Sequence, residues 1–126
     1  MTDRFIPYLV YTDAPAALAF LAKAFGFEER MRYPMPDGRI GHAELEYQGS
    51  FLYLASAYEE LGLLSPQKLA GLHCQVVCKV DDLDAHFERA RAAGATIATE
   101  PADQHGMRAY RAVDQEGHRW MFQCPL

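Results

Sequence analysis

Two similar units of apolar and polar residues follow one another along the chain. Residues 5–11 form one apolar run and residues 74–80 form another. After each run, apolar residues recur every three or four positions, over residues 15–25 and 83–93. This spacing gathers apolar side chains on one face of a helix. Each unit is therefore predicted to begin with a strand and to continue with a helix.

Residues that commonly begin and end helices support these boundaries. Asp13 and Asp82 are candidate N-caps, because a side-chain oxygen can accept hydrogen bonds from the first amide groups of a helix. Pro15 suits a first helical turn, where its missing N–H is not needed. Gly26 and Gly94 follow the helices and can adopt the left-handed conformation of a C-cap.

The two units form an internal repeat with a constant spacing. Three pairs of residues that punctuate the pattern are separated by 68 positions: Asp13 and Asp81, Gly26 and Gly94, and Gly49 and Gly117. Strand patterns with hairpin turns follow each helix. The sequence thus predicts one α+β domain, residues 1–126, built from two β-α-β-β-β modules that form a curved mixed sheet with helices on the outer face. A ligand-sized cleft is expected where the modules meet.

The boundaries of the modules follow from the same pattern. Module one covers about residues 4–56 and module two about residues 72–126. A connector over residues 57–71 joins them and is predicted to contain a short helix around residues 58–64. Each module alone is too small to bury its own sheet well, so the two are expected to fold together.

Alternation within the predicted strands separates a helix-facing side from an opposite side. Over residues 72–80 the even positions are apolar and the odd positions more polar. The opposite side mixes aromatic and polar residues, as small-molecule pockets do, although a second core or a dimer interface is the alternative. The residues predicted to bind a ligand are Tyr8, His42, Glu44, Phe51, Tyr53, Gln75, Arg108, Tyr110, Arg119 and Met121.

Charge and composition narrow the range of partners. The chain has a net charge of -5 and no run of lysine or arginine, which argues against nucleic acid as a partner. Its apolar stretches fall short of the roughly 18 residues that a membrane span needs, and its N-terminus lacks a signal-peptide core. We therefore expect a cytoplasmic protein with a small-molecule ligand and neither a nucleic-acid nor a membrane partner.

The cysteines fit the same picture. Cys74, Cys78 and Cys124 lack Cys-x-x-Cys spacing, so a structural zinc is not expected. Cys74 and Cys78 are interpreted as small buried apolar residues.

The paired strand–Asp–helix–Gly units resemble the vicinal oxygen chelate superfamily of glyoxalases, bleomycin-resistance proteins and extradiol dioxygenases. The segments 34–45 and 114–120 look like those of its PhnB-like subfamily. The resemblance covers nearly the whole chain. It implies paired β-α-β-β-β modules and a frequent homodimer, in which the partner chain often helps to build the cleft.

The resemblance also implies where metal-using members hold their ion. Those positions correspond to about Ile6, Tyr53, Gln75 and Met121, of which only Gln75 is an ordinary ligand. No metal and no cofactor are therefore expected. An alternative is that the pairs His42-x-Glu44 and His73-x-Gln75 hold zinc or nickel.

Three functions are compatible with these observations. The first is a metal-independent binding protein that sequesters an aromatic or peptide antibiotic, similar to the bleomycin-resistance branch, with no catalytic residue. The second is a metal-dependent isomerase, lyase, thiol transferase or dioxygenase, which rests on analogy of fold. The third is a dimeric interaction module without a ligand. The aromatic lining and the missing metal ligands favour the first.

Overall fold

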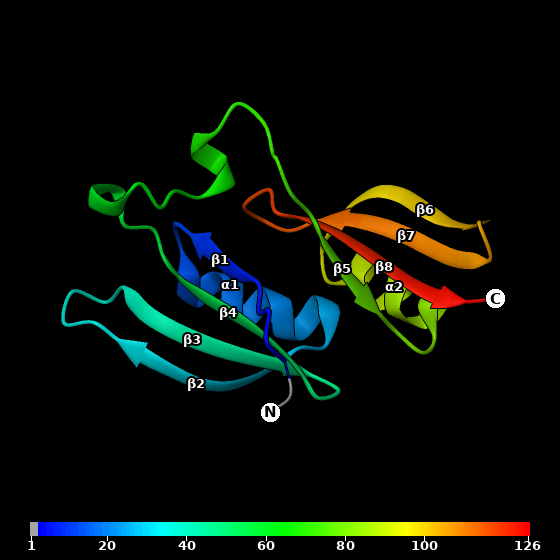
Figure 1. Cartoon of the computed structure of the whole chain (residues 1–126), viewed down its shortest axis with the longest axis horizontal. Coiled ribbons are helices and arrows are strands. Elements are labelled where there is room, and N and C mark those ends of the chain that lie inside the picture. The colour runs from blue at the N-terminus through cyan, green and yellow to red at the C-terminus, as the bar shows by residue number, and fades with distance from the viewer. Residues whose placement is uncertain (1–2) are drawn as a thin grey trace.

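The structure is a computed structural model that describes residues 3–126. Two sets of strands, each with its own helix, lie side by side (Figure 1). The first module contains β1 (Tyr8–Tyr11), α1 (Ala14–Phe20), η1 (Leu21–Phe25), β2 (Glu28–Pro34), β3 (Ile40–Tyr47) and β4 (Ser50–Ser56). The second contains β5 (Val76–Lys79), α2 (Leu83–Ala92), β6 (Thr96–Gln104), β7 (Met107–Val113) and β8 (Arg119–Pro125).

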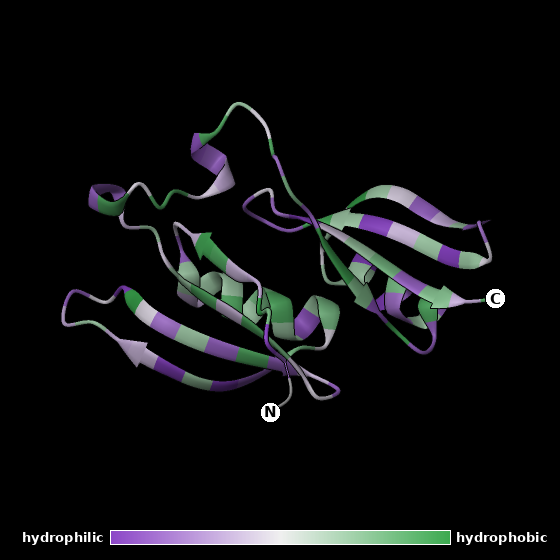
Figure 2. Ribbon diagram, in the orientation of Figure 1, coloured by the Kyte–Doolittle hydropathy of each residue, from purple (hydrophilic) through white to green (hydrophobic). Residues whose placement is uncertain are grey.

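Each module carries its own four-stranded sheet. The strand orders are β1-β4-β3-β2 and β5-β8-β7-β6. In each sheet the first strand pairs in parallel with the last, and the remaining pairs are antiparallel. Hydrophilic and hydrophobic residues alternate along these strands (Figure 2). The predicted α+β class and the paired β-α-β-β-β modules are confirmed.

The helix caps match the prediction. The Asp13 carboxylate accepts a hydrogen bond from the Ala16 amide, and the Asp82 carboxylate accepts one from the Ala85 amide, both at 3.1 Å. Gly26, the C-cap of η1, and Gly94, which follows the C-cap of α2, have φ angles of 81° and 96°, which glycine adopts without steric cost. The first helix holds one residue more between its caps than the second. Its last part, η1, is a π-helix, whose wider turn accommodates that extra residue.

The strands at the start of the modules are shorter than predicted. β1 begins at Tyr8 and β5 at Val76, because each pairs with its partner strand over only four residues. Residues 72–75 lie exposed ahead of β5. Cys74 is therefore exposed, contrary to the prediction, while burial raises the pKa of Cys78 to about 11. All three cysteines are free.

The connector also differs from the prediction. Instead of one helix over residues 58–64 it forms two single 3₁₀ turns, η2 (Glu59–Leu61) and η3 (Pro66–Lys68). Tyr58 and Leu63 bridge across the first turn and fold this part of the connector back on itself. In the chain from residue 3 onward, no helix is both long enough and apolar enough to cross a bilayer.

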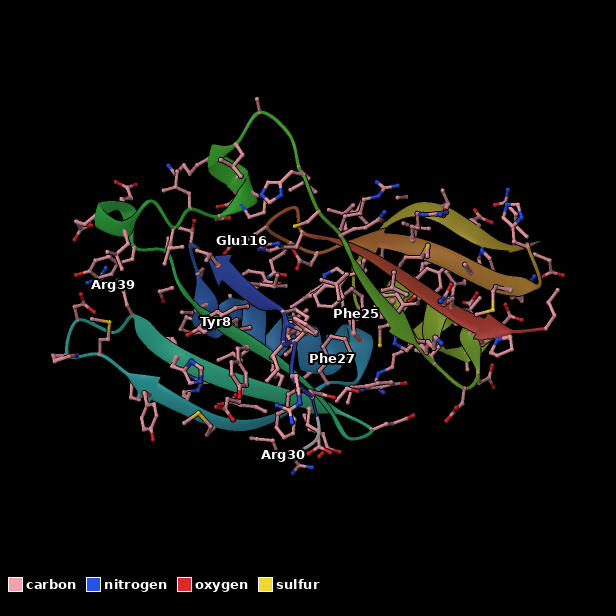
Figure 3. The ribbon with its side chains drawn as sticks, in the orientation of Figure 1. Tyr8, Phe25, Phe27, Arg30, Arg39 and Glu116 are labelled. Carbon is pink, nitrogen blue, oxygen red and sulfur yellow. The ribbon has the colours of Figure 1, made fainter. Side chains whose placement is uncertain are left out.

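One hydrophobic core joins the two modules. Phe25 lies between them and contacts aromatic rings from both, including Phe27, Trp120 and Phe122 (Figure 3). His86 on α2 adds polar contacts, since its Nε2 lies 2.9 Å from the Phe25 carbonyl oxygen. The helix-facing sides of both sheets are thus buried together, and the opposite sides carry no helix.

A buried turn between β7 and β8 forms a second link between the modules. The Asp114 carboxylate accepts hydrogen bonds from the Tyr11 hydroxyl at 2.6 Å and the Trp120 indole at 3.2 Å. The Glu116 carboxylate accepts the amides of Thr12 and Asp13, at 2.6 and 2.7 Å. The polar part of the segment 114–120 therefore holds the first module against the second.

Candidate functional site

Five of the predicted ligand residues lie together on the helix-free side of the first sheet. We call this set the aromatic face: Tyr8 on β1, His42 and Glu44 on β3, and Phe51 and Tyr53 on β4. Strand pairing brings them together, because Tyr53 is the cross-strand partner of both Tyr8 and Glu44. All five are partly or largely exposed.

A chain of hydrogen bonds connects three residues of this face. The Tyr8 hydroxyl lies 2.6 Å from His42 Nδ1, and His42 Nε2 lies 2.9 Å from a Glu44 carboxylate oxygen. The Tyr53 ring packs edge-on against both rings, with centroid distances of 5.7 Å to Tyr8 and 4.8 Å to His42. Partial burial raises the pKa of Tyr8, and the negative charge of Glu44 adds to the effect. The Tyr8 phenol therefore keeps its proton near neutral pH.

Two hollows flank the aromatic face. The seam hollow, of about 650 Å³, lies where the modules meet and is lined by Phe5, Phe51, Val77, Lys79 and Trp120, among others. The connector hollow, of about 510 Å³, is lined by Tyr8, Val10, Arg39, Ala55, Leu61 and Leu63, among others. Strand β4 links the two, because Phe51 lines the first and Ala55 the second, with Tyr53 between them.

The predicted placement of Arg108 and Tyr110 is wrong. Tyr110 is fully buried on the helix-facing side of β7, where its hydroxyl lies 2.6 Å from His86 Nδ1. Arg108 points the same way and donates hydrogen bonds to Asp84 on α2 and to Asp103. Neither side chain belongs to the same face as the aromatic residues of the first module.

The length of one turn explains this error. In the first module Glu46 pairs with Phe51 across four intervening residues, whereas in the second Val113 pairs with Arg119 across five. A shift of one residue moves every side chain of a strand to the other face. The helix-free side of β7 therefore carries Arg111, the cross-strand partner of Met121, which the constant 68-residue spacing misses.

The remaining predicted residues belong to the second module. Arg119 and Met121 lie on the helix-free side of β8, and Gln75 lies exposed just before β5. Within one chain, these residues and the aromatic face lie on separate sheets.

Comparison with known proteins gives the family. The profile described as the Glyoxalase/Bleomycin resistance protein/Dioxygenase superfamily matches residues 4–122. The chain belongs to this superfamily. An uncharacterized protein of Mycobacterium bovis is 36% identical over 124 residues, covering 95% of this chain and 82% of its own length.

Solved structures of the superfamily share the fold. TioX from Micromonospora sp. ML1 is 33% identical, with a TM-score of 0.79, and the match covers 98% of this chain and 99% of TioX. The fosfomycin resistance protein FosX from Listeria monocytogenes, in complex with Mn(II) and sulfate, has a TM-score of 0.73 at 14% identity, over 100% of this chain and 94% of FosX. The second likeness is one of fold alone.

The positions that hold metal in other members of the superfamily do not fit a divalent ion here. Ile6 and Gln75 lie just outside β1 and β5, and the strand residues that pair with Tyr53 and Met121 are Tyr8 and Val77. These side chains offer one amide, a thioether and phenols, which are poor ligands for such ions. Among residues 3–126, no group of three histidine, cysteine, aspartate or glutamate side chains is arranged to hold a metal.

The alternative pair of metal-binding motifs is not assembled either. His42 and Glu44 are hydrogen-bonded to one another, and His42 also contacts Tyr8. His73 and Gln75 lie exposed in the segment that leads into β5. The chemistry available on the aromatic face is therefore stacking, hydrogen bonding and the charge of Glu44.

Proposed function

We propose that this protein is a metal-independent binding protein that sequesters an aromatic or peptide antibiotic on its aromatic face. The observation that carries the proposal is the cluster of Tyr8 and His42, which are hydrogen-bonded, with the Tyr53 ring packed against both, on the helix-free side of the first sheet between two hollows. Aromatic rings fixed in this way can stack on a planar ligand with little loss of side-chain entropy.

The electrostatics of the face favour a neutral or cationic ligand. Glu44 lies within the cluster, and the neighbouring Glu46 is the only other acid on β3, where it is paired with Arg30. Among residues 3–126, no arginine is paired with Glu44. A cationic amine on the ligand could therefore pair with the Glu44 carboxylate.

We further propose that the functional unit is a homodimer. The helix-free side of the second sheet carries Lys79, Arg111 and Arg119, whereas that of the first carries Glu44 and the Glu46 carboxylate that is paired with Arg30. These opposite charges would favour contact between the first sheet of one chain and the second sheet of another. Light scattering should give the mass of two chains, and a monomer at micromolar concentration would contradict the proposal.

Binding is tested by calorimetric titration with a panel of planar aromatic and aromatic-peptide antibiotics. Metal-free protein should bind at least one of them, and the ligand should be recovered chemically unchanged. Tyr53→Leu should weaken binding roughly tenfold, because a ring that stacks is replaced by an aliphatic side chain. Its melting temperature serves as the control for folding. Binding that requires added Zn²⁺, Ni²⁺ or Mn²⁺ would contradict the proposal. The absence of binding to every antibiotic in the panel would also contradict it.

A further inference from the structure

Tyr8 belongs both to the aromatic face and to the connector hollow. From β1 its ring reaches across β4 to His42 on β3, since these strands are neighbours in that order. Val10, Ala55 and Gly41 come from the same three strands and line the hollow. Tyr8 itself is half exposed, at 50%. The Tyr8 hydroxyl is therefore a polar group at the border between the aromatic face and the connector hollow.

The hydrogen-bond chain fixes the direction in which Tyr8 donates. An ionised carboxylate can only accept, so His42 Nε2 carries the proton that faces Glu44. With one proton on the ring, at Nε2, the Nδ1 atom is an acceptor, and the Tyr8 hydroxyl donates its single proton to it. What remains on the Tyr8 oxygen is acceptor capacity alone. Among residues 3–126, the His42 ring is the only hydrogen-bond partner of this oxygen.

Apart from Tyr8, the connector hollow has an apolar lining with three polar side chains, those of Arg39, Ser56 and Tyr58. Leu61 and Leu63 from the connector line the hollow together with Val10 and Ala55 from the sheet. The Arg39 guanidinium lies 5.3 Å from the centre of the Tyr58 ring, and the Arg39 Nε donates a hydrogen bond to Asp37 at 2.8 Å. The volume of about 510 Å³ lies in the range of small-molecule sites.

We propose that the connector hollow binds an apolar molecule that carries one O–H or N–H donor, and that the Tyr8 oxygen accepts this donor. The proposal rests on the proposed binding function and adds to it a subsite and a chemical class: phenols, indoles and similar rings with a single donor. Glu44 acts as a positioning residue, because it sets the tautomer of His42 and hence the polarity of Tyr8. A ligand group that can only accept would find no donor on the Tyr8 hydroxyl.

The test compares two probes that differ only in the donor, 2-naphthol and 2-methoxynaphthalene. For the unmodified chain, 2-naphthol should bind roughly tenfold more tightly, the value of one hydrogen bond at a partly buried site. Shifts in the methyl NMR signals of Val10, Leu61 and Leu63 should accompany binding, while those of Val76 and Val77 in the seam hollow stay unchanged.

Two variants separate the role of Tyr8 from general effects. Tyr8→Phe should remove the preference for 2-naphthol, because the acceptor is lost and the ring is kept. Glu44→Gln should reduce it, because the amide can donate to His42 Nε2 and so allow the other tautomer. The ¹⁵N signals of the His42 ring should report that change directly. Glu88→Gln, on the exposed side of α2, is the matched control and should retain the preference.

The outcomes distinguish this inference from the function on which it rests. Equal binding of the two probes overturns the inference and leaves ligand binding intact. Binding of neither probe also overturns it, while the antibiotic titration decides the broader function separately. A preference that survives Tyr8→Phe assigns the acceptor to another residue and overturns the role of Tyr8.

Discussion

His86 is a buried histidine whose two ring nitrogens both have partners in the core. Nδ1 lies 2.6 Å from the Tyr110 hydroxyl, and Nε2 lies 2.9 Å from the Phe25 carbonyl oxygen. The carbonyl only accepts, so Nε2 carries the proton and Nδ1 accepts from Tyr110. Burial lowers the pKa of His86, and the positive charge of Arg89 acts in the same direction. From sequence alone His86 reads as an isolated residue of the helix surface, because its partners lie 24 and 61 positions away.

The lowered pKa of His86 gives a specific pH dependence of stability. In the unfolded chain a histidine titrates near pH 6.5, roughly, so below that pH the unfolded state binds the proton more readily than the folded state. The contribution of His86 is therefore complete above about pH 6.5 and decreases as the pH falls toward its folded-state pKa. Urea unfolding between pH 8 and pH 5 should show this loss.

Two glutamine variants isolate the effect of His86. His86→Gln, which has no titrating ring, should flatten the pH dependence of the unfolding free energy. His105→Gln removes an exposed histidine and should leave the slope of the parent protein unchanged. The same slope in both variants would show that His86 is not its source.

The turn between β7 and β8 is the element on which the link between modules depends. Glu116 accepts hydrogen bonds from the amides of Thr12 and Asp13, and from the hydroxyl of the fully buried Ser65 at 2.6 Å. Glu116→Ala leaves these three donors without an acceptor, which should cost about 3 kcal/mol of unfolding free energy. Gln115→Ala, at the exposed neighbour, should cost far less. Chemical denaturation of the two variants measures the difference, and equal costs would contradict this role.

Local residue patterns were sufficient to predict most helices and strands. The prediction of which side chains share a sheet face failed where the length of a turn changed. The caps Asp13 and Asp82 follow from local spacing, and the structure has them as predicted. Alternation also places the five aromatic-face residues on one side of a sheet, while their role in ligand binding stays a prediction. Arg108 and Tyr110 were misplaced because one extra residue between Val113 and Arg119 reverses the faces of β7, a change that alternation within a strand cannot reveal. The buried roles of His86 and Glu116 depend on contacts between modules, which no local pattern encodes.

At the scale of the whole molecule, the shared core predicts that both modules unfold together. Phe25 comes from the first module and packs on His86, Trp120 and Phe122 of the second. Phe25→Ala should therefore lower the unfolding free energy by about 4 kcal/mol, because it opens a cavity between the modules. Trp120 fluorescence, which reports on the second module, and far-ultraviolet circular dichroism should give one coincident transition.

An exposed phenylalanine provides the control for this variant. Phe5 is 96% exposed, so Phe5→Ala should leave the midpoint nearly unchanged. Two separate transitions in the parent protein would show that each module is stable without the other.

The π-helical turn at Leu21–Phe25 and the longer turn after β7 also bear on ancestry. Each accommodates a single residue that the other module lacks, and each does so while the same sheet faces stay buried. This is the outcome expected when one ancestral gene segment is copied and the two descendants then gain residues independently. Selection removes insertions that would exchange the buried and exposed faces of a strand. It tolerates insertions that a π-helical turn or a longer hairpin turn can accommodate. An alignment of the two halves should therefore place one gap inside the first helix and another at the tip of the last hairpin.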